Sequence, residues 1–306
     1  MIIVERGRNF KAPKLERKRV TICIAAVCEV YSNNLVVLCT DRKASSILGS
    51  TETAYKDRPI GKNLVGLYAG DESGIIALHI LLKKHMRPVA DLDETNVKVQ
   101  AAAALDARKR DLVERLVQGR FAFSYDEFLK HGKERLTQNW FTRTEDDIAQ
   151  ITLGADCILA GFIADMPMIV TTDGSSNVRI QDHFASIGEG AYLADSVLLH
   201  RGQNETKQFG ETLYNVYGAK RYAERVGSVG PATTIAILHR DKAPQVVTPE
   251  GMNDLDEKYK KFGPQSVPFD LKFELGCTRF RRHRVRCFME QEVGHGETAV
   301  YPGIQA

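Results

Sequence analysis

The sequence predicts an α+β fold in which two β-sheets pack face to face with helices outside them, a four-layer αββα sandwich. Two observations lead to this prediction. Strand and helix patterns come in blocks along the chain, in the order strands, helices, strands, helices, strands, without regular strand-helix alternation. The chain has 306 residues, 43% of them hydrophobic, so it is long enough to bury one large core or two small ones.

The first block predicts two β-hairpins. "TICIAAVC" (21–28) and "LVVLCTD" (35–41) are short, apolar and β-branched, and the turn-rich "EVYSNN" separates them. "RPIGKNLVGLYAG" (58–70) predicts a second hairpin that turns around Gly61-Lys62-Asn63. The first hairpin is expected to be buried on both sides because its strands are almost purely apolar.

The second block predicts helices. After Gly70 the apolar residues recur at helical spacing, which indicates helices over residues 71–87 and 97–119. Ser124 and Glu127 have the spacing of a capping box and are expected to open a short helix over residues 125–136.

The remaining blocks repeat this order. Apolar runs separated by Pro or Gly turns predict strands at residues 156–164, 166–174, 177–181 and 184–188. Helical patterns then cover residues 190–201 and 206–226, and a last strand pair covers residues 233–240 and 244–249. We therefore expect a basic N-terminal extension (1–20), one αββα domain (21–249) and a C-terminal appendix (250–306) in which residues 271–277 alternate like one more strand.

Composition limits the function classes. No apolar run reaches the roughly 18 residues that cross a bilayer, and the start lacks the order of a secretory signal, so we expect a cytoplasmic protein without a membrane partner. The six cysteines lack the C-x2-C spacing of a zinc site; we interpret them as reduced structural thiols and expect no metal or cofactor.

Both ends of the chain are basic. Residues 1–20 contain seven Lys or Arg and two Glu, and "RFRRHRVRC" (279–287) contains five arginines. A run of charges is usually a solvated surface, so we do not assign nucleic acid as the main partner. The arginine-rich segment is interpreted as a solvated edge or subunit contact, with an RNA or regulator site as the alternative.

A set of polar residues surrounds the first hairpins. Thr21 begins the first strand, and Asp41-Arg42-Lys43-Ala44-Ser45 closes the second. Lys56 stands before the third strand, and Ala69-Gly70 ends the strand that completes the second hairpin. This pattern resembles the proteasome β-subunit family of N-terminal nucleophile (Ntn) hydrolases, and "TICIAAVC" looks especially like the stand-alone bacterial proteasome-like proteins. The resemblance covers about residues 21–248 and is most specific over residues 21–70.

The resemblance implies a threonine peptidase or amidohydrolase. Thr21 would be the nucleophile, and its own α-amine, with a pKa of roughly 7.7 to 8.0, would be the base. Lys56 would favour the alkoxide of Thr21, and Asp41 would hold Lys56 charged and oriented. The Gly70 amide would donate to the oxyanion, and a glycine there would let the substrate backbone come close.

Three further residues have supporting roles by position. Lys43 belongs to the motif that closes the second strand. Glu189 stands where the family has the serine of a Gly-Ser-Gly turn, and it is expected to relay protons, to bind a cationic substrate or to lie in solvent. Ser228 is the candidate replacement for a family serine before the last strands.

The main departure from the family is that Thr21 is internal and follows Val20, whereas the self-cleaving propeptides of the family end in glycine. A valine codon, GTG, can start translation in bacteria, so we expect internal initiation or cleavage to expose Thr21. The alternative is a catalytically silent proteasome-like subunit that acts as a scaffold or binding module. The expected partners are a peptide or amide substrate and further copies of the chain in a homo-oligomer, and the sequence leaves open whether an ATP-dependent unfoldase is a further partner.

Overall fold

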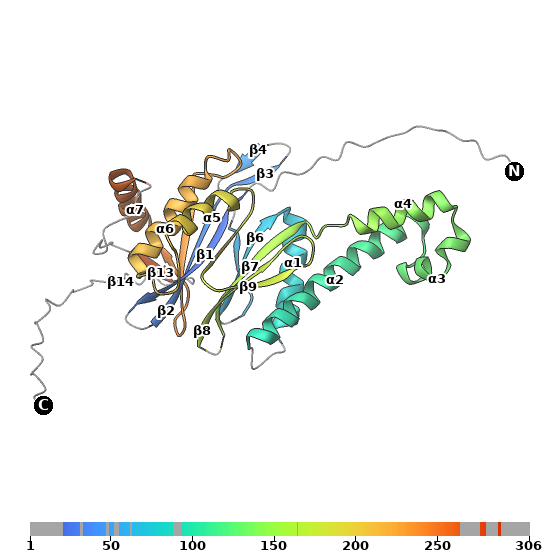
Figure 1. The fold of residues 1–306 in the computed structure, drawn as a ribbon, viewed down its shortest axis with the longest axis horizontal. Coiled ribbons are helices and arrows are strands. Elements are labelled where there is room, and N and C mark those ends of the chain that lie inside the picture. Colours follow the sequence, from blue (N-terminus) through green and yellow to red (C-terminus); the bar gives the residue numbers. More distant parts are fainter. Residues whose placement is uncertain are drawn as a thin grey trace, which may run out of the picture.

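The structure, a computed structural model, is a mixed α and β fold with two large antiparallel sheets (Figure 1). It describes residues 21–30, 33–46, 49–51, 55–61, 63–87, 93–163, 165–263, 276–279 and 287–288. The predicted extension over residues 1–20, residues 271–275 of the predicted additional strand and most of the arginine-rich segment lie outside these described residues. The α+β prediction is confirmed at this coarse level.

The first predicted hairpin is present as two interior strands of the larger sheet. β1 (Cys23–Val30) pairs antiparallel with β2 (Asn33–Asp41), and Cys23 lies opposite Thr40. Residues 22–28 are all buried, because side chains alternate between the two faces of the strand and both faces are covered. This double coverage explains why the run is continuously apolar rather than alternating.

The larger sheet has the strand order β10-β1-β2-β11-β12-β13-β14. Its other strands are β10 (Phe184–Ile187), β11 (Thr233–His239), β12 (Gln245–Val247), β13 (Gly276–Arg279) and β14 (Cys287–Phe288). The smaller sheet has the order β5-β6-β7-β8-β9, with β5 (Asp57–Pro59), β6 (Leu64–Gly70), β7 (Ala155–Ile163), β8 (Met166–Thr172) and β9 (Val178–Gln181). A separate pair, β3 (Ala44–Ser46) and β4 (Gly49–Thr51), follows β2.

Helices lie on the outer faces of both sheets. In Figure 1, α1 (Glu72–Met86) and α2 (Glu94–Phe121) flank the smaller sheet, while α5 (Ala191–His200) and α6 (Phe209–Ala223) flank the larger one. One apolar cluster joins β1 and β2 to α5 and α6, and a second joins β6 and β7 to α1 and α2. A third cluster, which includes Cys23, Ala25, Leu67 and Ile158, lies between the sheets.

Two helices were not predicted from the sequence. The capping box of Ser124 and Glu127 is confirmed at α3 (Tyr125–Arg135), but α4 (Gln138–Ala149) follows it. Both pack with the end of α2 around a small cluster that contains Phe128 and Phe141.

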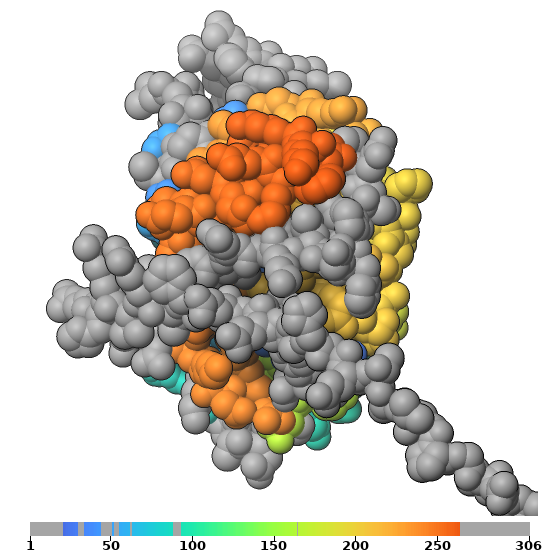
Figure 2. Space-filling view, turned by 90° about the vertical axis from the view of Figure 1, so that its left-hand side faces the viewer, coloured from blue at the N-terminus to red at the C-terminus, as the bar shows by residue number. Residues whose placement is uncertain are grey.

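The second unpredicted helix is α7 (Pro249–Phe262), which begins after the N-cap Thr248 and lies on the face shown in Figure 2. Its Leu255 is fully buried in the cluster that covers the larger sheet. β13 pairs with β12 in that sheet, so the packed part of the chain continues past residue 249. Within the described residues, we find no helix with the length and apolar character that crossing a membrane requires.

Candidate functional site

Thr21 lies two residues before Cys23, the first residue of β1, and is only 2% exposed. The antiparallel register of β1 and β2 brings the start of one strand beside the end of the other, so Thr21 meets Asp41. The Thr21 hydroxyl donates a hydrogen bond of 2.6 Å to Asp41 Oδ1. The local topology of one hairpin therefore creates the first contact of the site.

Asp41 is fully buried and is held by several donors. Its Oδ1 also accepts the backbone N–H of Ile22 at 3.0 Å, and its Oδ2 accepts the N–H of Gly230 at 3.1 Å. Gly230 lies in the loop that leads into β11, which is the other neighbour of β2. These bonds fix the carboxylate between two chain segments and offset the cost of burying it.

Lys56 completes the cluster from the other sheet. Its ammonium contacts Thr21 Oγ1 and lies 2.5 Å from Asp41 Oδ1, and the residue is 9% exposed. The backbone carbonyl of Lys56 accepts the N–H of Tyr68 at 3.0 Å, which ties the residue to β6. Thr21 Oγ1 thus accepts a hydrogen bond from a buried ammonium and donates one to a buried carboxylate. The ammonium favours negative charge on the threonine oxygen, whereas the carboxylate, as acceptor of the hydroxyl proton, favours the neutral hydroxyl.

Gly70 ends β6 with φ of +146°, a conformation that favours glycine. A Cβ at this position would lie 2.3 Å from the carbonyl oxygen of Gly154. The chain itself therefore requires a glycine at position 70, whether or not a substrate approaches. In the described residues Gly70 makes no hydrogen bond with Thr21.

Glu189 lies in a turn that packs against the backbone of Thr21. The N–H of Gly190 faces the Thr21 carbonyl oxygen at 3.4 Å, and a Cβ at Gly188 would be 2.3 Å from the same oxygen. The turn over residues 188–190 is thus packed against the backbone of the candidate nucleophile. The half-buried Glu189 side chain forms no hydrogen bond or ion pair with Thr21 or Lys56 among the described residues.

Lys43 contacts the loop that supports Asp41, and Ser228 belongs to this loop. Lys43 Nζ donates to the carbonyl of Gly227 at 3.1 Å, while Ser228 Oγ turns back to the carbonyl of Val226 at 3.4 Å. The loop reaches Asp41 through the backbone N–H of Gly230 and not through the Ser228 hydroxyl. The structure therefore places both predicted residues near the site without bringing either side chain onto Thr21.

A buried lysine of α6 was missed in the sequence analysis. Lys220 has no exposed surface, and its ammonium donates to Glu224 Oε1 at 2.6 Å and to the carbonyl of Pro231 at 2.7 Å. Pro231 follows Gly230 directly, so this pair anchors the loop that holds Asp41. The i, i+4 spacing of Lys220 and Glu224 was the available signal, but it is common on exposed helices.

Cys23 lies two residues from Thr21 and carries a thiol, a group that acts as a nucleophile in some hydrolases. Burial raises its pKa far above the ordinary value, and its Sγ donates to the Tyr68 carbonyl at 3.4 Å. A desolvated thiol that stays protonated is a poor nucleophile. Cys28, Cys39 and Cys157 are also free and buried.

Comparison with models of known families finds no match to the chain, and comparison with curated proteins finds no relative.

Proposed function

We propose that the protein is an Ntn-type threonine hydrolase, a peptidase or amidase that acts through Thr21 once its α-amine is free. The observation that carries the proposal is the buried contact of Thr21 with Lys56 and Asp41, three residues from separate chain segments. A threonine needs such surroundings to react, because its hydroxyl is a poor nucleophile at neutral pH.

The arrangement of the core supports the finer fold assignment that belongs to this proposal, a four-layer αββα sandwich. One apolar cluster lies between the sheets, and one lies between each sheet and its helices. Side chains of β1 alternate between two of these clusters: Ile24 and Ala26 face α6, while Cys23 and Ala25 face the smaller sheet. The resemblance of the motifs around Thr21 to proteasome β-subunits points to the same fold.

In the proposed reaction the free α-amine of Thr21 takes the hydroxyl proton, and Oγ1 attacks the carbonyl carbon of the substrate amide. The Lys56 ammonium stabilises the developing alkoxide, and Asp41 holds Lys56 in place. The α-ammonium gives this proton to the leaving nitrogen, the C–N bond breaks, and an ester remains on Thr21. Water then hydrolyses the ester, which releases the carboxylic acid product and restores the hydroxyl. We assign the Gly70 N–H as the oxyanion donor.

The test uses two forms of the protein, the full chain and a chain that begins at Thr21. We expect the shorter form to hydrolyse fluorogenic peptide amides and the full chain to be inactive, because the nitrogen of Thr21 is acylated by Val20 in the full chain. Thr21→Ala in the shorter form is the control and should be inactive. Equal activity of the control and its parent would refute the proposal.

Two observations favour the second candidate, a silent scaffold or binding subunit. The sequence carries Val20 before Thr21, and the Thr21 hydroxyl is bonded to buried groups on both sides. The cluster would then stabilise the junction of the sheets and perform no reaction. The activity comparison above separates the two candidates.

We also propose that the chain forms a homo-oligomer through its outer helices. Ile76 and Ile80 on α1 are 41% and 58% exposed, and Tyr192 and Leu199 on α5 are 65% and 68% exposed. Large exposed apolar side chains on one helix face mark interaction surfaces. Light scattering at micromolar concentration should give a multiple of the 34.2 kDa chain mass, and a monomer mass would refute the assignment.

A further inference from the structure

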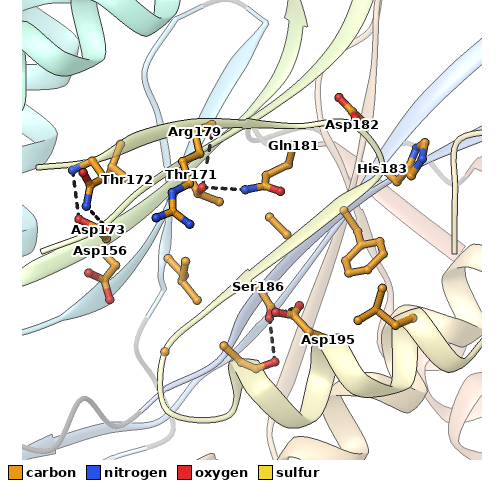
Figure 3. Close-up of a pocket in the computed structure, with 17 residues that line it drawn as sticks. Asp156, Thr171, Thr172, Asp173, Arg179, Gln181, Asp182, His183, Ser186 and Asp195 are labelled. Carbon is orange, nitrogen blue, oxygen red and sulfur yellow. Dashed lines mark hydrogen bonds between the residues drawn. The ribbon is translucent and has the colours of Figure 1, made fainter. Parts of the chain in front are cut away.

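A cavity of about 610 Å³ lies between the two sheets, at one edge of each (Figure 3). Thr171, Arg179 and Gln181 of β8 and β9 line one wall, while Ser186 of β10 and Asp195 of α5 line the opposite wall. Cavities of 300 to 1,000 Å³ are typical of ligand sites. The volume is therefore large enough for a short peptide segment.

The cavity lies next to the candidate nucleophile. Ile187 and Gly188 line it, and Ile187 is the strand partner of Cys23. A Cβ at Gly188 would be 2.9 Å from Thr21 Cγ2, so one glycine separates the cavity from the threonine side chain. Lys56 and Asp41 occupy the other side, at Oγ1. The cavity therefore lies beyond Gly188, on a different side of Thr21 from these two groups.

Two sheet edges border this cavity. β9 is the last strand of the smaller sheet and β10 the first strand of the larger one, and neither has a second strand partner in the described part of the chain. Backbone groups at such an edge can pair with an added extended segment. This geometry favours an extended chain over a compact ligand.

The charged residues of the lining are mainly acidic, and His183 is a further titratable residue there. The cavity contains Asp156, Asp173, Asp182 and Asp195, and Arg179 is its one lysine or arginine. Figure 3 places Asp156 and Asp173 at one end and Asp195 beside Ser186. Asp195 Oδ1 accepts the Ser186 hydroxyl at 2.6 Å, and burial raises the pKa of Asp195. A cationic group in the cavity would stabilise this carboxylate.

We propose that this cavity binds the substrate segment beside the scissile amide and selects an extended segment that carries lysine or arginine. The role of the bound segment as a substrate rests on the proposed function, whereas binding of a basic peptide does not require hydrolysis. The two claims can therefore fail separately.

The experiment measures the fluorescence anisotropy of two labelled peptides. They have the same sequence except at two positions, both of which are Lys in the first peptide and Glu in the second. The Thr21→Ala variant of the full chain is the binding protein, so cleavage cannot interfere. We expect saturable binding of the lysine peptide and at least about 5-fold weaker binding of the glutamate peptide. Equal affinities, or no binding of the lysine peptide, would overturn the inference.

Two substitutions test whether the peptide binds in the cavity. Asp195→Asn and Asp156→Asn should each weaken the lysine peptide about 5-fold, because each removes one charge from the lining with little change in shape. Asp146→Asn, on the exposed surface of α4, is the matched control and should bind like the parent. Asp156 also accepts the N–H of Gly174 at 2.8 Å, so if Asp156→Asn fails to fold, Asp195→Asn decides the outcome. Parent-like binding by Asp195→Asn would overturn the inference.

Discussion

At the scale of single residues, the Lys56 ammonium provides the most direct test of the arrangement around Thr21. Lys56→Ala in the chain that begins at Thr21 should lower kcat for amide hydrolysis about 10²- to 10³-fold, because it removes the charge that stabilises the alkoxide. It also leaves the buried carboxylate of Asp41 without its cation, so we expect a lower free energy of unfolding as well.

Activity should therefore be measured well below the melting temperature of this variant. Lys84→Ala, on the exposed side of α1, is the control for loss of a lysine. Hydrolysis by Lys56→Ala at the parent rate would remove Lys56 from the site.

A second residue-scale prediction concerns Gly188, whose φ of +101° and contact with the Thr21 carbonyl both require glycine. Gly188→Ala should lower the free energy of unfolding by about 2 kcal/mol or more and should displace Thr21. Gly202 has φ of +60° with no atom near its added Cβ, so Gly202→Ala should cost only about 1 kcal/mol.

Gly227 meets no atom within 4 Å, and alanine there should change stability by less than about 0.5 kcal/mol. Urea unfolding of the three variants measures these differences. A Gly188→Ala variant as stable as Gly227→Ala would contradict the close packing of the turn on Thr21.

At the scale of elements, α6 supports the site through Lys220. Lys220→Met should destabilise the protein by about 2 to 4 kcal/mol, since it leaves the Pro231 carbonyl without its donor and removes one cation from Glu224. It should also slow hydrolysis, because the adjacent Gly230 N–H holds Asp41.

The matched control is Lys260→Met, whose lysine is 72% exposed and paired with Asp256 on α7. That change should cost less than about 0.5 kcal/mol. Chemical denaturation and kcat of both variants test the claim, and equal behaviour of the two would show that the buried contact is not needed.

The second element-scale prediction concerns α7. Leu255→Ala should lower the free energy of unfolding by about 2 to 5 kcal/mol, because a fully buried leucine leaves a cavity in the cluster that covers the larger sheet. Leu129→Ala, at a position 62% exposed on α3, should change stability by less than about 0.5 kcal/mol. If both substitutions have the same small effect, α7 is not part of the main core.

The sequence predicted those helices and strands whose residues follow one clear pattern, such as an apolar run or a capping box. The continuous apolar runs of β1 and β7 and the capping box of α3 predicted those elements because local chemistry determines them. α4 and α7 were missed because their few buried residues stand among charged ones. α7 did carry a local signal, a threonine N-cap followed by proline and a glutamate.

The same distinction applies to the site. Thr21, Asp41 and Lys56 were predicted as a group from the motifs, and the structure brings them into contact. The tertiary partner of Lys220 could not be predicted, because Pro231 approaches it only through the path of a loop. Gly70 was predicted for its effect on a substrate, yet its contact with Gly154 comes from the pairing of β6 with β7.

At the scale of the whole molecule, the candidate site lies where the two sheets meet at one end. The segment before β1 contributes Thr21, β2 contributes Asp41, and the segment before β5 contributes Lys56 from the side of the opposite sheet. A shift of one sheet against the other would separate Lys56 from Thr21. The site therefore depends on the packing between the sheets. Buried apolar residues such as Cys23 and Leu67 form this packing.

The most direct measurement for the central claim, that Thr21 is a nucleophile, is the intact mass of the chain beginning at Thr21 after treatment with an electrophilic β-lactone. The account predicts one adduct, located on Thr21 by fragmentation and removed by hydroxylamine as an ester is, and no adduct in the Thr21→Ala form. An unmodified chain, or an adduct on any residue other than Thr21, would contradict the account.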